Sequence, residues 1–200
     1  MHVRTRFEVD PEVLKLRGVL LDRLEDSARA VDADVFASIA EPLWDTVLRR
    51  GFEGVGAHEG TIWLTDADGE HLVPAVNTGG HAAQLVGKFK QPLGKGIISM
   101  VYASEQPYCE NDVYQSEQHD GTLNESLGLV TCALMAVPFY FASALRGVVS
   151  CVQLKQLDSE EPDPAGFSGL ATSRLAETAT LLERLVNHRL YSLCLGLEHD

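Results

Sequence analysis

Apolar residues near the start of the chain recur at three- and four-residue steps, the spacing of one face of an α-helix. The helix is expected to begin at Asp10-Pro11, because aspartate caps helix N-termini and proline suits the first turn. Its apolar stripe consists of Val13, Leu16, Leu20 and Leu24. The pattern therefore predicts an amphipathic helix ahead of the rest of the chain.

A second helix is expected after Asp34. Pro42 lies inside this pattern and predicts a kink or a split, since proline lacks the N–H that a helix interior needs. Gly51 stands where a C-terminal cap belongs. The residues expected to share the apolar face are Phe36, Ala40, Leu43 and Val47.

The pattern changes to that of β-strands after Gly60. Residues 61–65 (TIWLT) and 71–76 (HLVPAV) predict two strands joined by a turn at 66–69 (DADG). Pro74 suggests a sheet edge or a bulge, because proline cannot donate a ladder hydrogen bond. The further expected elements are a third strand over 88–93, a short helix over 97–103, an extended segment at 107–109, a polar segment over 111–128, and the two strongest strands over 131–141 and 145–156.

A long C-terminal helix is expected to follow the acidic loop at 158–164 and to begin near 165–168. Its apolar stripe consists of Leu175, Ala179, Leu182, Val186, Leu190 and Leu193. The chain thus reads as helices, an antiparallel-looking strand set with a helical insertion, and a final helix. This order predicts an α+β fold rather than alternating βαβ units.

Composition fits a globular domain, because 45% of the 200 residues are hydrophobic and 22% are charged. We expect an N-terminal helical extension over 1–34 and one domain over 35–190. Within that domain, the sheet core is expected at about 60–157 and the C-terminal helix at about 165–195.

Charge and cysteine usage exclude several classes of protein. The net charge of −13 and the lack of a Lys/Arg cluster argue against nucleic-acid binding. The four cysteines form no CxxC motif and no Cys/His ligand pair, so we expect no zinc site. No apolar signal region follows the N-terminal arginines, which favours a cytoplasmic protein with reduced thiols.

The stretch over 126–145 is uncharged for 20 residues, roughly the length of a membrane span. It contains Gly128 and Pro138, and β-formers dominate its centre. Two buried strands and a turn have the same length, and we therefore expect no membrane segment.

Four segments occur in an order and spacing that together resemble a known family. They are 60–66 (GTIWLTD), like a first strand and turn; 92–97 (PLGKGI), like a corner that opens a short helix; 106–113 (QPYCENDV); and 134–149 (LMAVPFYFASALRGVV), like a closing strand pair. The family that these segments resemble is the GAF family of small-molecule sensor domains, over about residues 35–190.

The resemblance implies a roughly six-stranded antiparallel sheet, with helices from both ends of the chain on one face. It places a ligand pocket under a helix-and-loop lid on the other face. It implies binding and signalling rather than catalysis, and a homodimer formed by parallel terminal helices. The alternative is that the helical stripes simply pack on their own sheet. No output motif follows the domain, so we expect a signalling protein partner or a longer chain.

The residues proposed to line the pocket combine aromatic surface with a few polar groups, as ligand sites do. The lid, expected over 112–130, has four acids and no Lys or Arg. An anionic ligand would therefore rely on Lys88, Lys90, Lys95 or helix amides. The proposed lining residues are Trp63, Ile98, Tyr102, Tyr114, Thr131 and Ala133.

Several chemistries are disfavoured by spacing. The segment at 94–96 (GKG) lacks the GxxxxGK[ST] pattern of a phosphate loop and is expected to be a turn before a helix. Cys109 as a nucleophile needs a base, and His119 is the only nearby one in the sequence. Without such a base, Cys109 is expected to be a small buried apolar residue.

Known ligands of the family also match poorly. No cysteine precedes a histidine, as bilin attachment requires, and heme would need His81 or His119 as an axial ligand. The segment over 154–158 (LKQLD) departs from the cyclic-nucleotide signature. The ligand and any cofactor stay open. The alternatives to a sensor are a ligand-free dimerisation scaffold and a thiol-based methionine sulfoxide reductase.

Overall fold

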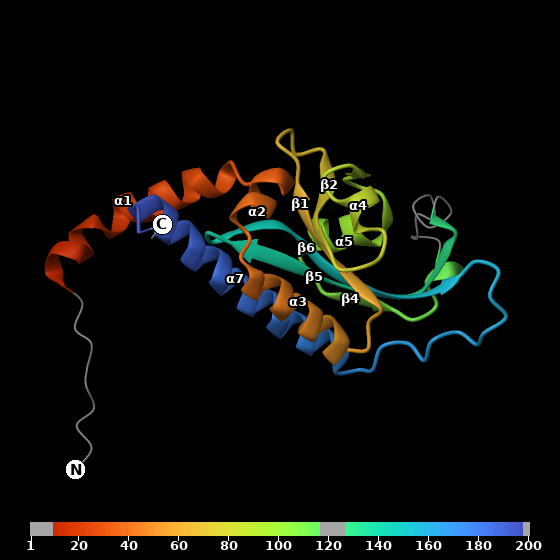
Figure 1. Cartoon of the computed structure of the whole chain (residues 1–200). Helices are drawn as coiled ribbons and strands as arrows, with labels where there is room; N and C mark the ends of the chain where they lie inside the picture. The colour runs from red at the N-terminus through yellow and green to blue at the C-terminus, as the bar shows by residue number, and fades with distance from the viewer. Residues whose placement is uncertain (1–9, 117–126, 198–200) are drawn as a thin grey trace, which may run out of the picture.

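The computed structural model describes residues 10–116 and 127–197, and its centre is a six-stranded antiparallel sheet (Figure 1). The strand order is β3-β2-β1-β6-β5-β4. The strands are β1 (Glu59–Thr65), β2 (His71–Asn77), β3 (Gln91–Pro92), β4 (Tyr108–Glu110), β5 (Leu129–Phe141) and β6 (Ala144–Gln156). The predicted α+β class is confirmed, although the predicted third strand is only two residues long.

Helices cover both faces of this sheet. Long helices from the two ends of the chain lie on one face, where α3 and α7 run side by side (Figure 1). On that face are α1 (Pro11–Arg29), α2 (Ala33–Ile39), α3 (Pro42–Gly54) and α7 (Ala171–Leu195). On the other face are α4 (Ala82–Leu85), α5 (Gly96–Ser104) and the 3₁₀ turn η1 (Val113–Gln115).

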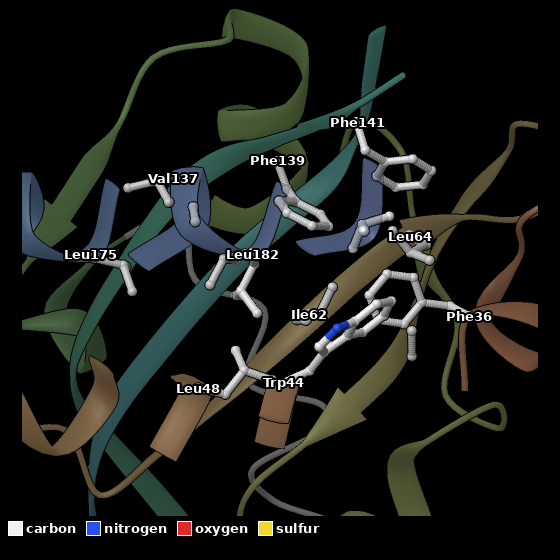
Figure 2. Close-up of a cluster of buried hydrophobic side chains, with 14 of the residues drawn as sticks. Phe36, Trp44, Leu48, Ile62, Leu64, Val137, Phe139, Phe141, Leu175 and Leu182 are labelled. Atoms are coloured by element: carbon white, nitrogen blue, oxygen red, sulfur yellow. The ribbon is translucent and has the colours of Figure 1, made fainter. Parts of the chain in front are cut away.

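The main hydrophobic core lies between the sheet and the long helices. Figure 2 shows Phe36 and Trp44 of the helical layer meeting aromatic and aliphatic side chains of the strands. The Phe36 and Trp44 ring centroids are 5.3 Å apart, and those of Phe139 and Phe141 are 5.7 Å apart. Burial of these large side chains supplies most of the free energy that holds the helices to the sheet.

Pro42 splits the predicted second helix into α2 and α3, as expected, and becomes the first residue of α3. The predicted apolar face is only partly right beyond this break. Val47 packs against the core, but Leu43 is exposed, and the residues that α3 buries are Trp44, Leu48 and Phe52. The reason is that the proline ends one helix and starts another, so the helical phase is reset.

Gly51 does not cap α3, because the helix continues to Gly54. Its role is the close approach of α3 to α7. A Cβ at position 51 would lie 2.5 Å from Cγ2 of Thr178 on α7, which is closer than side-chain atoms pack. The cap prediction is therefore wrong, and the glycine serves helix packing.

The C-terminal stripe is confirmed over most of its length, since Leu175, Ala179, Leu182, Val186 and Leu190 are buried. The helix begins at Ala171, a few residues later than predicted. The α1 stripe is buried only near its end, at Leu24. Val13 and Leu16 are exposed, because the first half of α1 leads away from the domain (Figure 1).

The strand pairing explains two sequence features. Pro74 lies at a bulge, where Trp63 pairs with Pro74 and Ile62 pairs with Val76. The uncharged stretch at 126–145 contributes β5 and the tight turn into β6, with positive φ at Ala142 and Ser143. Within residues 10–116 and 127–197, no helix is both long and apolar enough to cross a bilayer.

Candidate ligand pocket

A cavity of about 90 Å³ lies on the sheet face opposite the long helices, under the start of α5. Strand alternation produces this face, because Thr61 and Trp63 of β1 point to the cavity side while Ile62 and Leu64 point into the main core. The described lining is Glu59, Thr61, Trp63, Pro74, Asn77, Leu85, Gln91, Gly96, Ile97, Ile98, Leu127, Leu129, Thr131, Leu134, Ser150, Val152 and Leu154.

Trp63 forms an aromatic wall whose orientation is fixed. Its indole Nε1–H donates a hydrogen bond of 2.8 Å to Oγ of Ser150 on the neighbouring strand β6. Its ring also packs edge-on against Phe89, with centroids 6.1 Å apart. The Ser150 hydroxyl keeps its own hydrogen to donate, so this wall offers a rigid apolar surface beside a directed donor.

A second polar wall comes from β2. The side-chain Nδ2 of Asn77 donates to Oγ1 of Thr61 at 2.9 Å, and Oδ1 of Asn77 accepts from the backbone N–H of Gly79 at 2.8 Å. Both ends of the Asn77 amide are thus held in place. The Thr61 hydroxyl accepts one bond here and retains a hydrogen for another partner.

The corner at 94–96 supports the start of α5. Gly94 and Gly96 have φ values of 94° and 79°, which favour glycine. Nε2 of Gln91 donates to the carbonyl of Lys95 at 2.8 Å, and the Ser99 hydroxyl donates to the carbonyl of Pro92 at 2.9 Å. The predicted turn before a helix is confirmed. The corner sets the angle at which Gly96, Ile97 and Ile98 reach the cavity.

The structure brings three of the six predicted lining residues to the cavity: Trp63, Ile98 and Thr131. Ala133 lies on the opposite face, in the main core. The cause is a bulge in β5, where Thr131 pairs with Leu154 but Ala133 pairs with Gln153. The additional residue, Cys132, reverses the alternation, so positions 131 and 133 no longer share a face.

The two predicted tyrosines lie elsewhere. Tyr102 is one turn beyond Ile98 on α5, and its hydroxyl lies near Thr65 and Arg146; burial raises its pKa above the usual value for tyrosine. Tyr114 is 50% exposed and interacts with Asp163 of the acidic loop. Neither is among the described residues that line the cavity. The predicted lid at 112–130 lies partly outside the described residues.

The polar lining residues Glu59, Asn77, Gln91 and Ser150 were missed by sequence reasoning. Side-chain alternation along β6 could have identified Ser150, which shares a face with Val152 and Leu154. This required the pairing of β6 with β1, in which Ser150 lies opposite Thr61. Glu59 and Asn77 lie at strand ends. Polar residues are common at strand ends, so their presence there does not indicate a binding site.

Basic residues do not line the described part of the cavity. Nζ of Lys88 donates to the carbonyl of Ala83 at 2.6 Å, and Lys90 lies 3.6 Å from the carboxylate of Asp66. Among the described lining residues, Glu59 carries the only formal charge. The described wall therefore offers hydroxyl, amide and apolar contacts, with one carboxylate at its edge.

Burial raises the pKa of three of the four thiols. The pKa of Cys109 is raised by burial and, to a smaller extent, by the negative charge of Glu110. Burial also raises the pKa of Cys132, and it raises that of Cys151 to about 12. A raised pKa leaves the thiol protonated near neutral pH, the less reactive form. His119, the proposed base or heme ligand, lies outside the described residues. In the described ranges, no three His, Cys, Asp or Glu side chains are grouped to hold a metal ion.

Comparison with known families agrees with this geometry. The family model described as "GAF domain" matches residues 40–184, most of the chain. The protein belongs to the GAF domain family, and the fold that the four sequence segments implied is confirmed. Among curated proteins, no sequence matches the chain.

Solved structures share the fold at low sequence identity. The GAF domain of a phosphoenolpyruvate-protein phosphotransferase from Coxiella burnetii has a TM-score of 0.60 at 17% identity, covering 94% of this chain and all of that one. Free methionine-R-sulfoxide reductase from Neisseria meningitidis has a TM-score of 0.55 at 19% identity, with 96% and 99% covered. A domain of a putative sensor histidine kinase from Sinorhizobium meliloti has a TM-score of 0.55 at 13% identity, with 78% and 96% covered.

Proposed function

We propose that this protein is a regulatory or sensory domain that binds a small molecule in the cavity under α5. Membership of the GAF family supports this role. Structural relatives include domains of a phosphotransferase and of a putative sensor histidine kinase, both of which are signalling or regulatory contexts. In this proposal, occupancy of the cavity biases the terminal helices α1 and α7, which pair with a second copy or a signalling protein.

The proposal rests mainly on the cavity wall formed by Trp63 and the hydroxyl groups beside it. Its indole is 7% exposed and fixed by Ser150, and hydroxyl groups of Thr61, Thr131 and Ser150 share the same face. Such a combination of rigid aromatic surface and a few directed polar groups is typical of small-molecule sites. A face that served only as core would be closed by apolar side chains.

Cavity size limits the ligand. The 90 Å³ found here lies below the roughly 300–1,000 Å³ of typical ligand pockets. A cyclic nucleotide, a heme or a bilin is larger than the volume enclosed by the described lining residues. We therefore propose a small metabolite as the ligand, held by apolar contact with Trp63 and Ile98 and by hydroxyl donors.

Thermal shift against a panel of small metabolites tests the proposal. A ligand at about 100 times its Kd stabilises the folded state by about 2.7 kcal/mol, which is readily detected. Thr131→Val removes one pocket hydroxyl at nearly constant shape and is expected to weaken binding. Thr180→Val, on α7 and away from the cavity, is the matched control and should bind normally. Equal binding by both variants would exclude Thr131 from the site.

The small cavity favours a second candidate, a scaffold that works only through its surfaces. Absence of stabilisation by any metabolite, together with a stable dimer in light scattering, would support the scaffold over the sensor.

A thiol-based reductase is the third candidate, because a methionine sulfoxide reductase shares the fold. The raised thiol pKa values of Cys109 and Cys132 disfavour it. Reduction of methionine sulfoxide by the unaltered protein, lost in Cys109→Ser or Cys132→Ser, would establish this activity instead.

A further inference from the structure

Glu59 places a carboxylate at the edge of the cavity under α5. It is the first residue of β1, and Thr61 and Trp63 follow at two-residue steps, so all three side chains lie on the cavity face of the sheet. Within residues 10–116 and 127–197, no hydrogen bond or ion pair reaches the Glu59 carboxylate. The cavity therefore has an unpaired anionic group in its wall.

The bases that lie near this end of β1 are bound to other groups. Nε of Arg49 donates to the carboxylate of Asp45 at 2.8 Å, and its Nη1 donates to the carbonyl of Thr78 at 3.2 Å. Nδ1 of His58 accepts from the backbone N–H of Leu154 at 2.9 Å, which holds this ring at the backbone of β6. In the described ranges, neither base forms an ion pair with the carboxylate of β1.

Gly79 provides the space that the carboxylate occupies. A Cβ at position 79 would overlap Oε2 of Glu59 and would lie 3.0 Å from its Oε1. The backbone N–H of Gly79 donates to Oδ1 of Asn77 at 2.8 Å instead of to the carboxylate. The carboxylate thus lies over bare backbone and keeps its acceptor sites for another partner.

The residues paired across β1 and β6 form two polar–apolar steps on the cavity face. Glu59 pairs with Val152, and Thr61 pairs with Ser150. All four residues line the cavity. Residues two apart on a strand are about 7 Å apart, so the two hydroxyls lie one step beyond the carboxylate. Each hydroxyl accepts one bond from a neighbouring side chain and keeps a hydrogen to donate.

We propose that the ligand of this cavity is a small protonated amine. Its ammonium group pairs with Glu59, and an oxygen of the same ligand accepts a hydrogen bond from Thr61 or Ser150. The inference rests on the proposed function and names the chemical class of its ligand. A carboxylate beside an apolar side chain is costly unless it is paired, and an ammonium group supplies both the opposite charge and the donors. An anionic ligand would meet the like charge of Glu59.

Matched pairs of small compounds test the charge requirement by ligand-observed NMR titration, in phosphate buffer so that no buffer amine competes. The amines are ethanolamine, 1-amino-2-propanol and 4-amino-1-butanol, and each is compared with the diol in which a hydroxyl replaces the ammonium group. Lactate is the anionic comparison. We expect the best amine to bind about tenfold or more tightly than its diol, because hydrogen bonds to charged groups are the stronger ones. A diol or lactate that binds as tightly as the amines would overturn the proposal.

Glu59→Gln removes the charge at nearly constant shape and should weaken binding of the best amine by about tenfold or more, with little effect on its diol. Glu177→Gln is the matched control, at an exposed glutamate of α7 on the other face of the sheet. No described bond of Glu59 is lost, so urea denaturation should show an unchanged free energy of unfolding in both variants. Equal amine binding by Glu59→Gln and the unaltered protein would show that the amine pairs elsewhere.

Gly79→Ala tests the position of the carboxylate without changing its charge. The new Cβ displaces the flexible end of Glu59, whereas Gly80→Ala, with open space at its Cβ position, is the matched control. We expect Gly79→Ala to change the affinity for the amine by about threefold or more, because the attraction depends on the distance between the charges. Equal affinity in the two glycine variants would contradict the placement of the ammonium group at Glu59.

Other outcomes separate this inference from the proposed function. A metabolite without an amine that binds through Thr131 would leave the proposed pocket intact and the amine inference wrong. Absence of binding by all three amines would overturn the inference, while the metabolite panel still decides whether the cavity binds a ligand. An amine whose binding depends on Glu59 supports both.

Discussion

The hydrogen bond between Trp63 and Ser150 can be tested by its contribution to stability. Ser150→Ala leaves the indole N–H without its partner in a site where Trp63 is 7% exposed and Ser150 is 3% exposed. An unpaired buried donor costs about 1–3 kcal/mol. The adjoining 90 Å³ cavity has room for a water molecule that could accept this bond, so we expect the lower end, about 1–1.5 kcal/mol.

For a domain of this size, that loss lowers the melting temperature by about 2–6 °C. Urea denaturation at fixed protein concentration gives the free energy of unfolding directly, and the fixed concentration keeps any dimer contribution constant. Ser192→Ala on α7, which removes a hydroxyl bonded to its own helix, is the control and should cost a few tenths of a kcal/mol.

A double-mutant cycle with Trp63→Phe isolates the pair, because phenylalanine has no N–H to leave unpaired. In that background, Ser150→Ala should cost far less than in the unaltered protein, with a coupling energy of at least about 0.5 kcal/mol. An equal cost in both backgrounds would show that Ser150 does not hold the indole. The pocket wall on which the proposed function depends would then not be rigid.

Three further predictions address other parts of the fold. Gly51→Ala should destabilise the protein by about 1–3 kcal/mol through its clash with Thr178, whereas Gly54→Ala, with open space at its Cβ position in the same helix, should be neutral or stabilising in urea denaturation. Ser143→Gly should raise the free energy of unfolding by about 0.5–1 kcal/mol, and with it the melting temperature. The reason is that Ser143 has a φ of 61°, which glycine adopts at less cost. Cys151, with its pKa raised to about 12 by burial, should resist thiol labelling at pH 8 while the protein is folded and react at once in urea; rapid labelling of the folded protein would contradict its burial.

The sequence located the strands and helices well where the local pattern decides them. The runs at 61–65 and 71–76 became β1 and β2, and the bulge anticipated at Pro74 is present. The stripe from Leu175 to Leu190 became the buried face of α7. In each case the periodicity of apolar residues, or the missing N–H of a proline, acts within a few residues of the position concerned.

The pocket was harder to predict because its faces depend on pairing between distant segments. Trp63 and Thr131 line the cavity, whereas Ala133 lies in the main core, since one additional residue at Cys132 reverses the alternation of side chains along β5. The residue types at 131–133 do not predict that bulge. Ser150 became visible as a pocket residue only when β6 paired with β1 and put its hydroxyl beside the indole of Trp63.

By itself, the sequence determined the α+β class, most of the helices and strands and the order of motifs that marks the GAF family, because these follow from spacing along the chain. The tertiary structure decided which face each residue occupies. It reset the phase of α3 after Pro42, turned Ala133 away from the cavity and, among the described residues, left most apolar side chains in the first half of α1 exposed. The physical reason is that a side chain's direction depends on register, bulges and helix phase, and these are fixed only when segments far apart in the chain pack together.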